Sequence, residues 1–160
     1  MFEISETVRN QAEQIKLVIF DVDGVLTDGR LYFGDSGEEY KAFYAKDGLG
    51  MKMLMQSGVE VGIITARSAP LVTKRMENLG IQHLYQGQSD KVPAFEEMAH
   101  KLGLSHQQVS DAPPEVIQRA HWTTPQAGGL GGARNVCDLI MSAQGTLQAM
   151  IEGQVRGITN

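Results

Sequence analysis

Cysteine and histidine are scarce in this sequence, and their scarcity excludes two kinds of site. Cys137 is the single cysteine among 160 residues, so the chain forms no internal disulfide and fits a reducing compartment. The four histidines stand far apart, at positions 83, 100, 106 and 121, whereas a zinc site needs Cys and His residues in a cluster. We therefore expect neither disulfide bonds nor a zinc site.

Basic residues and long apolar runs are also few. Fourteen Lys and Arg residues against 19 Asp and Glu residues give a net charge of −5, which leaves no basic surface for a nucleic-acid backbone. No apolar run approaches the ~20 residues that span a bilayer, and the polar residues 1–14 lack the hydrophobic core of a signal peptide. We expect a folded cytoplasmic protein without nucleic-acid or membrane partners.

Short, continuously apolar segments alternate with helical patterns along the chain. Such segments are typical of parallel strands buried on both faces, and we expect strands at residues 16–20, 59–65 and 81–85. The turn at residues 34–37 predicts a β-hairpin between residues 31–33 and 39–43. Helices are expected at residues 1–14, 49–56, 70–79, 91–102 and 133–150. This order predicts an α/β fold with a doubly wound, Rossmann-like parallel sheet and a β-hairpin inserted after the first strand.

Reactive side chains follow three of the expected strands. Asp21 and Asp23 come directly after the first strand, Thr65 ends the second, and Lys91 follows the third. Ligands of open parallel sheets bind beyond the carboxyl ends of the strands. Two neighbouring carboxylates favour a divalent cation, and hard oxygen ligands in a phosphate site favour Mg²⁺. One carboxylate can act as a nucleophile and the other as an acid or base, while Thr65 and Lys91 would neutralise an anionic group.

Each of these signals also has a simpler interpretation. Asp and Gly are common turn formers, so residues 21–24 are compatible with an ordinary turn after a strand. Thr65 alone is compatible with a strand end, and Lys91 alone with a solvated helix start. The coincidence of all three at successive strand ends favours a functional site.

The segment FDVDGVLTDG at residues 20–29 resembles the first motif of the haloacid dehalogenase superfamily of phosphatases. Together with AKDG at 45–48, IITAR at 63–67 and HLYQGQSDK at 83–91, it is similar to one branch, the 3-deoxy-D-manno-octulosonate 8-phosphate (Kdo-8-phosphate) phosphatases. Residues 127–129 and 136–140 match as well. The resemblance covers roughly residues 15–150 and implies a single phosphatase domain without a cap over residues 1–160. Residues 1–14 would be an N-terminal extension, and residues 133–160 a C-terminal helix and tail.

The resemblance implies a role for each candidate site residue. Asp21 would be the nucleophile, and Asp23 would protonate the leaving alkoxide and then activate water. The Asp21 carboxylate and the Asp23 backbone carbonyl would hold Mg²⁺, and Thr65 and Lys91 would bind the phosphoryl oxygens. The residues implied to contact the sugar acid are Tyr44, Ala45, Lys46, Asp47, Gly48, Lys52, Arg67 and Arg75. For Lys52 and Arg75, a solvated helix face explains the sequence equally well.

The implied reaction is the hydrolysis of Kdo 8-phosphate to Kdo and phosphate through an aspartyl phosphate, in lipopolysaccharide sugar biosynthesis. The resemblance also implies a homotetramer, in which hairpins pack together and a neighbour's tail covers the site. Aromatic residues on and after the hairpin are consistent with such an interface, although they are also compatible with covering the subunit's own sheet. These residues are Tyr32, Phe33, Tyr40, Phe43 and Tyr44.

The sequence departs from the superfamily at its fourth motif, an acidic cluster that completes the Mg²⁺ site. Residues 107–110 look like the start of a fourth strand, yet residues 111–115 already resemble a later segment of the family. Either Asp111 replaces the missing carboxylate, or the motif is lost. The loss of a buried strand would threaten folding. We therefore expect that residues are missing between Ser110 and Asp111, which would show as a chain break with a Cα–Cα distance well beyond the ~3.8 Å of a peptide bond. Two alternative functions remain open: a phosphatase of a related sugar acid, such as a nonulosonate 9-phosphate, or an inactive oligomeric homologue.

Overall fold

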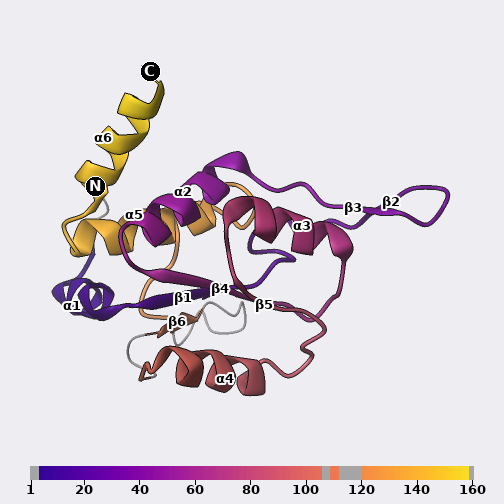
Figure 1. Ribbon diagram of the computed structural model, residues 1–160, viewed down its shortest axis with the longest axis horizontal. Helices are drawn as coiled ribbons and strands as arrows, with labels where there is room; N and C mark the ends of the chain where they lie inside the picture. The colour runs from indigo at the N-terminus through magenta and orange to yellow at the C-terminus, as the bar shows by residue number, and fades with distance from the viewer. Residues whose placement is uncertain (1–3, 106–108, 112–119, 159–160) are drawn as a thin grey trace.

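A four-stranded parallel sheet lies at the centre of the computed structural model, which describes residues 4–105, 109–111 and 120–158 (Figure 1). The strand order is β5-β4-β1-β6, and every neighbouring pair is parallel. The strands are β1 (Leu17–Phe20), β4 (Glu60–Ile64), β5 (His83–Tyr85) and β6 (Val109–Asp111). Since β1 lies between β4 and β6, whatever follows β1 lies in the middle of the sheet edge.

Helices cover both faces of this sheet, which confirms the doubly wound α/β fold. Helices α2 (Ala45–Gln56), α3 (Pro70–Leu79) and α5 (Gly132–Ala143) lie on one face, and α4 (Val92–Leu102) lies on the other (Figure 1). Successive side chains of β1 alternate between the two layers. Val18 and Phe20 belong to the core under α2, α3 and α5, whereas Leu17 and Ile19 pack against α4. Helix α1 (Glu6–Gln14) contacts α5.

Helix α2 begins at Ala45, four residues before the predicted start at position 49. Two glycines in its first turns hide the helix from a sequence pattern, because glycine is a poor helix former. Both glycines allow close packing instead. A Cβ on Gly50 would lie 2.6 Å from Cδ of Arg134 on α5, and a Cβ on Gly48 would collide with the guanidinium of Arg75. The glycines therefore let α5 and Arg75 approach the start of α2.

The prediction of one continuous helix over residues 133–150 is wrong. Helix α5 ends at Ala143, and α6 (Leu147–Ile158) follows as a separate helix. Gly145 adopts a φ of 72°, the left-handed conformation that glycine favours. Its amide donates to the carbonyl of Ser142 at 3.2 Å, and the amide of Thr146 donates to Met141 at 2.8 Å. This pair of hydrogen bonds is a Schellman motif, which ends a helix. Helix α6 then leads away from the sheet (Figure 1).

A β-hairpin follows β1, as predicted, and extends away from the body of the protein (Figure 1). It consists of β2 (Tyr32–Phe33) and β3 (Glu39–Tyr40), so its paired part is shorter than expected. Phe33 is 62% exposed and Tyr40 57% exposed. These rings do not cover the subunit's own sheet, whereas Phe43, after the hairpin, packs against the core.

Strand β6 runs through the junction at which we expected a chain break, and that expectation is wrong. Val109, Ser110 and Asp111 pair one after another with Leu17, Val18 and Ile19 of β1. The fourth strand of the sheet thus forms from the residues on both sides of the junction. Predicted strand residues 107 and 108, and residues 112–115 after the junction, lie outside the described residues.

Within the described ranges, no helix combines the length and the apolar character that crossing a bilayer requires. Helix α1 begins at Glu6, with Ser5 as its N-cap residue, rather than at position 1 as predicted. Helices α3 and α4 end at Gly80 and Gly103, whose φ angles of 80° and 65° are left-handed. Strand β5 begins at His83 rather than at position 81.

Candidate active site

A compact turn after β1 carries the two carboxylates of the first motif. Asp21 follows the strand directly, and its Oδ1 accepts a hydrogen bond from the Val22 amide at 2.6 Å. The buried hydroxyl of Thr27 accepts from the amides of Gly24 and Gly29 at 3.3 and 3.2 Å. Gly24 provides the positive φ, 83°, on which the turn depends. The turn interpretation of this motif is therefore correct, and the turn is also what holds both carboxylates at the sheet edge.

Lys91 reaches Asp21 from the end of a different strand. It is the N-cap residue of α4, and its Nζ lies 2.7 Å from Oδ2 of Asp21. The two side chains are 31% and 18% exposed, so the ion pair is only partly screened by water. An ammonium at this place is suited to bind an anion that approaches Asp21.

Thr65 follows β4 and is buried, with 2% of its surface exposed. Its amide donates to the carbonyl of Tyr85, and its carbonyl accepts from the amide of Gln88, both at 3.0 Å. Because Phe20 pairs with Ile63 in adjacent strands, Thr65 lies at the same edge as Asp21. The structure thus brings the three predicted strand ends together.

Lys41 is a further charged residue of the site, which the sequence analysis missed. Its Nζ lies 2.5 Å from Oδ1 of Asp23 and 2.7 Å from Oε1 of Glu39, and its side chain is 1% exposed. Arg67, which the sequence analysis included, lies 2.9 Å from Glu39 and 3.8 Å from Asp23. The four residues form a closed ring in which two cations alternate with two carboxyl groups. The only signal in the sequence was the place of Lys41 at the base of the hairpin.

The protonation states in this ring follow from its geometry. Burial by itself would lower the pKa of Lys41, but hydrogen bonds to Asp23 and Glu39 outweigh burial and raise it above the ordinary value. Hydrogen bonds from Lys41 and Arg67 lower the pKa of Glu39. Lys41 is therefore a cation and Glu39 an anion throughout the neutral range.

The predicted sugar-acid stretch, residues 44–48, is the N-terminal turn of α2. Tyr44 is its N-cap residue, and the side chains of Ala45 and Lys46 are exposed. Asp47 is buried, and its Oδ1 accepts a hydrogen bond from the Arg134 amide at 2.8 Å, in the first turn of α5. Burial raises the pKa of Asp47 despite that hydrogen bond. Asp47 thus links α2 to the start of α5.

The two remaining predicted cations lie on the helices around this turn. Arg75, on α3, is half-buried, and its guanidinium lies 5.8 Å from the centroid of the Phe43 ring and against Gly48. Arg75 is therefore part of the same surface as the start of α2. Lys52 is exposed on α2, one helical turn after Gly48.

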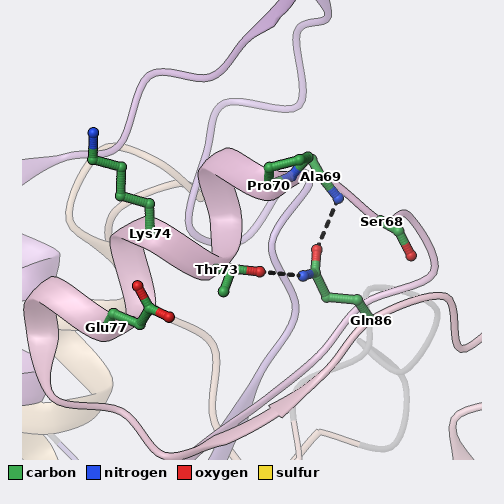
Figure 2. Close-up of a pocket in the computed structure, with 7 residues that line it drawn as sticks. All are labelled: Ser68, Ala69, Pro70, Thr73, Lys74, Glu77 and Gln86. Atoms are coloured by element: carbon green, nitrogen blue, oxygen red, sulfur yellow. Dashed lines mark hydrogen bonds between the residues drawn. The ribbon is translucent and has the colours of Figure 1, made fainter.

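A surface pocket of about 660 Å³ lies at the start of α3, between that helix and Gln86 (Figure 2). Gln86 connects two parts of its wall, because its Oε1 accepts from the Ala69 amide and its Nε2 donates to the Thr73 hydroxyl, both at 2.9 Å. None of the predicted site residues lines the pocket. Its lining residues are Ser68, Ala69, Pro70, Thr73, Lys74, Glu77 and Gln86.

The donor set at the strand ends fits a weakly held magnesium ion. Mg²⁺ is usually bound by one or two carboxylates together with waters and substrate phosphate, and here the Asp21 carboxylate and the Asp23 backbone carbonyl offer two oxygens. Among the described residues, no three Asp, Glu, His or Cys side chains gather in a metal-binding group. The register of β6 places the backbone of Asp111 level with Ile19, two residues, or ~7 Å, short of Asp21. This placement does not support Asp111 as the replacement ligand.

Known proteins share both the sequence and the fold. The 3-deoxy-D-manno-octulosonate 8-phosphate phosphatase of Salmonella typhi is 44% identical over 166 residues, which cover 90% of this chain and 88% of the relative. The crystal structure of the Yersinia pestis phosphatase of the same name has a TM-score of 0.88 and 40% identity, and the match covers 91% of this chain and 90% of that one. No family model matches the chain.

The chain belongs to the Kdo-8-phosphate phosphatase family. The resemblance inferred from the motifs is thereby confirmed, as is the haloacid dehalogenase type of fold. A Moraxella catarrhalis member was crystallised in complex with a magnesium ion, a phosphate ion and a Kdo molecule. That structure has a TM-score of 0.88 and 34% identity, and the match covers 92% of this chain and 97% of that one.

The alignment also shows that this family member is shortened. The alignment with the Salmonella typhi relative is 166 residues long, more than the 160 residues of this chain. The relative therefore contains residues that have no counterpart here. The sequence predicts that these extra residues fall at the junction of Ser110 and Asp111, where the fourth motif is missing.

Proposed function

We propose that this chain hydrolyses Kdo 8-phosphate to Kdo and inorganic phosphate in a Mg²⁺-dependent reaction, in the biosynthesis of the lipopolysaccharide sugar. The observation that carries the proposal is the pair Asp21 and Lys91, 2.7 Å apart at the edge of the sheet, in a chain of this family. The magnesium, phosphate and Kdo in the Moraxella catarrhalis relative support the same substrate and metal.

In the first half of the proposed reaction, a carboxylate oxygen of Asp21 attacks phosphorus and the bond between phosphorus and the sugar oxygen breaks. Asp23 gives its proton to the departing alkoxide, so that neutral Kdo hydroxyl leaves. Lys91 and Thr65 hold the phosphoryl oxygens and neutralise their charge as it shifts. The product of this half is a phosphoryl group on Asp21.

In the second half, Asp23 is ionised and takes a proton from a water molecule. The water oxygen attacks phosphorus, the bond to Asp21 breaks, and phosphate leaves while the Asp21 carboxylate is restored. When bound between Asp21 and the Asp23 carbonyl, Mg²⁺ would offset the charge of the phosphoryl oxygens and of Asp21. Two different tasks thus fall to two carboxylates that are two residues apart.

The sugar acid would lie between the carboxylates and the start of α2. Kdo 8-phosphate carries a carboxylate as well as a phosphate, and guanidinium groups bind carboxylates with paired hydrogen bonds. Arg67 lies beside Asp23, and Arg75 lies against Gly48. We propose that these two arginines, Lys52 and the helix start at residues 44–48 contact the sugar acid. Within that helix start, Asp47 acts indirectly, because it holds α5 in place.

We further propose that the protein is a single domain without a cap and that it assembles as a homotetramer in the cytoplasm. Between Asp23 and Thr65 the chain forms only the hairpin, α2 and β4, all of it described, so this segment contains no lid domain. The exposed rings on the hairpin, Phe33 and Tyr40, suit a contact between copies of the chain. Such a contact would shield a site that would otherwise stay open to water.

A phosphate-release panel tests the proposed function. The purified chain would be given Kdo 8-phosphate, a nonulosonate 9-phosphate and glucose 6-phosphate, each with Mg²⁺ and with a chelator. We expect the highest kcat/KM for Kdo 8-phosphate and no release in the chelator. A higher kcat/KM for the nonulosonate phosphate would contradict the substrate, and equal release in the chelator would contradict the metal.

A further inference from the structure

Lys41 occupies a position that an ordinary surface ion pair does not explain. Its ammonium is almost completely shielded from water, with 1% of the side chain exposed, and it contacts two carboxylates at once. Removing an ammonium from water is costly, and only close partners of opposite charge offset that cost. The two partners come from different parts of the chain. Asp23 belongs to the first motif, and Glu39 belongs to β3.

The ring also connects three segments that are distant in sequence. Lys41 follows β3 at the base of the hairpin, Asp23 lies in the turn after β1, and Arg67 lies in the loop after β4. Glu39 holds Lys41 on one side and Arg67 on the other, at 2.7 and 2.9 Å. Both Asp23 oxygens therefore face a cation, Oδ1 at 2.5 Å and Oδ2 at 3.8 Å.

We propose that Lys41 is a positioning residue, which fixes the carboxyl group of Asp23 in the orientation needed for proton transfer and ties that orientation to the hairpin. The inference rests on the proposed function, in which Asp23 is the acid and base. The proton moves between Asp23 and the leaving oxygen or the attacking water, and Lys41 keeps its own protons. The short contact lies at Oδ1, whereas Arg67 stands farther from Oδ2, so Oδ2 is the freer oxygen for that transfer.

The family resemblance implies that Arg67 contacts the sugar acid. The two cations of the ring, Lys41 and Arg67, therefore have different tasks. Arg67 is 44% exposed and can turn toward a ligand, whereas Lys41 is enclosed and cannot reach one without breaking its contacts with Asp23 and Glu39. A loss of Lys41 should therefore change the rate of the chemical step rather than the binding of the sugar acid. This difference separates a positioning role from a binding role.

The test compares Lys41→Met with the double variant Lys41→Met/Glu39→Gln in the full chain. The single variant leaves two carboxylates without their buried partner and is expected to unfold at a lower temperature. The double variant removes one of those charges, so we expect its melting temperature to return toward that of the wild type. For Lys41→Met we expect kcat on Kdo 8-phosphate to fall about 10- to 100-fold, with KM unchanged. For the double variant, in which Arg67 also loses its Glu39 partner, we expect the same fall in kcat.

A second substrate separates positioning of the acid from general damage. p-Nitrophenol is a good leaving group and needs little protonation, so kcat/KM for p-nitrophenyl phosphate should fall much less than for Kdo 8-phosphate. Equal losses on the two substrates would overturn the inference, as would a double variant with wild-type kcat. Lys101→Met, which breaks a distant ion pair with Glu97 on α4, is the matched control and should leave both substrates unaffected.

Crystal structures of the wild type and the double variant keep the inference testable if the proposed function fails. A wild type that does not release phosphate from Kdo 8-phosphate contradicts the proposed function alone. In that case a changed orientation of the Asp23 carboxyl group in the double variant supports the role of Lys41, and an unchanged orientation overturns it.

Discussion

The ammonium of Lys91 lies 2.7 Å from Oδ2 of Asp21, a residue 70 positions earlier in the chain. The contact joins the turn after β1 to the start of α4, which follows β5, and these two strands lie on opposite sides of β4 in the sheet. It requires the parallel order of β1, β4 and β5, because each crossover returns the chain to the same edge of the sheet. The fold thereby supplies a nucleophile and an anion-binding cation at one point.

Replacement of the nucleophile should remove activity without removing the fold. Asp21→Asn preserves the shape of the side chain and can still accept from the Val22 amide, but an amide neither attacks phosphorus nor offers an anion to Mg²⁺. We expect no phosphate release above background and an unchanged circular dichroism spectrum. Asp35→Asn, in the exposed hairpin turn, is the control. An Asp21→Asn rate near that of the wild type would refute the assignment.

Loss of the Lys91 ammonium should weaken both the binding and the stabilisation of the phosphoryl group. We expect Lys91→Met to lower kcat/KM on Kdo 8-phosphate by about 100- to 1,000-fold, since one lost donor in such a site costs that much. Steady-state kinetics checks the value. Lys74→Met, on the exposed surface of α3, should change kcat/KM by less than the error of the measurement. A similar loss in both variants would count against a special role of Lys91.

Mg²⁺ should bind weakly to this chain. The fourth motif is absent from the sequence, so water must take the place of a carboxylate. We expect an affinity lower than that of the Salmonella typhi relative by at least the 10- to 100-fold that the loss of an outer partner costs. Isothermal titration calorimetry of both proteins, with and without inorganic phosphate, measures it. Equally tight binding by the two proteins would show that another group supplies the missing ligand.

Assembly through the hairpin should depend on its exposed rings. Light scattering at micromolar concentration should give the mass of a tetramer for the wild type. Phe33→Glu would place a charge into the proposed contact and is expected to lower that mass, because aromatic side chains anchor such interfaces. Val92→Glu changes an equally exposed apolar residue on α4 and should leave the mass unchanged. A monomeric wild type would contradict the tetramer.

Asp47 should make the protein less stable as the pH rises. Because burial raises its pKa in the folded state, the folded protein holds this proton longer than the unfolded chain does. The contribution of Asp47 to the unfolding free energy is therefore fully present below its ordinary value of 3.8 and is lost as the pH approaches the raised value. Asp47→Asn lacks this titration. Urea unfolding from pH 4 to 7 should show Asp47→Asn gaining stability relative to the wild type; an unchanged difference would contradict this account.

The positions of the first three parallel strands and the carboxylate turn could be predicted from sequence because they depend on local patterns. The run before Asp21 is apolar at every position, and Gly24 marks the turn. The start of α2 could not be predicted, since Gly48 and Gly50 serve the packing of Arg75 and α5. Such requirements arise from distant partners and leave no periodic signal.

The electrostatic network was also hidden from sequence reasoning. Lys41 resembles any exposed lysine at a strand end, and only the fold places it between Asp23 and Glu39. The end of α5 depends on Gly145, whose left-handed φ interrupts a pattern that is otherwise helical on both sides. The missing fourth motif was visible in the sequence, but the continuity of β6 through Ser110 and Asp111 was not.

Covalent labelling of Asp21 tests the central claim most directly. The full chain would be mixed with Kdo 8-phosphate and Mg²⁺, quenched in acid during turnover, digested and mapped by mass spectrometry. The account predicts a phosphoryl group on the peptide that contains Asp21, and none on that peptide in Asp21→Asn. Continued release of phosphate with no phosphoryl group on Asp21, or with one on another residue, would contradict it.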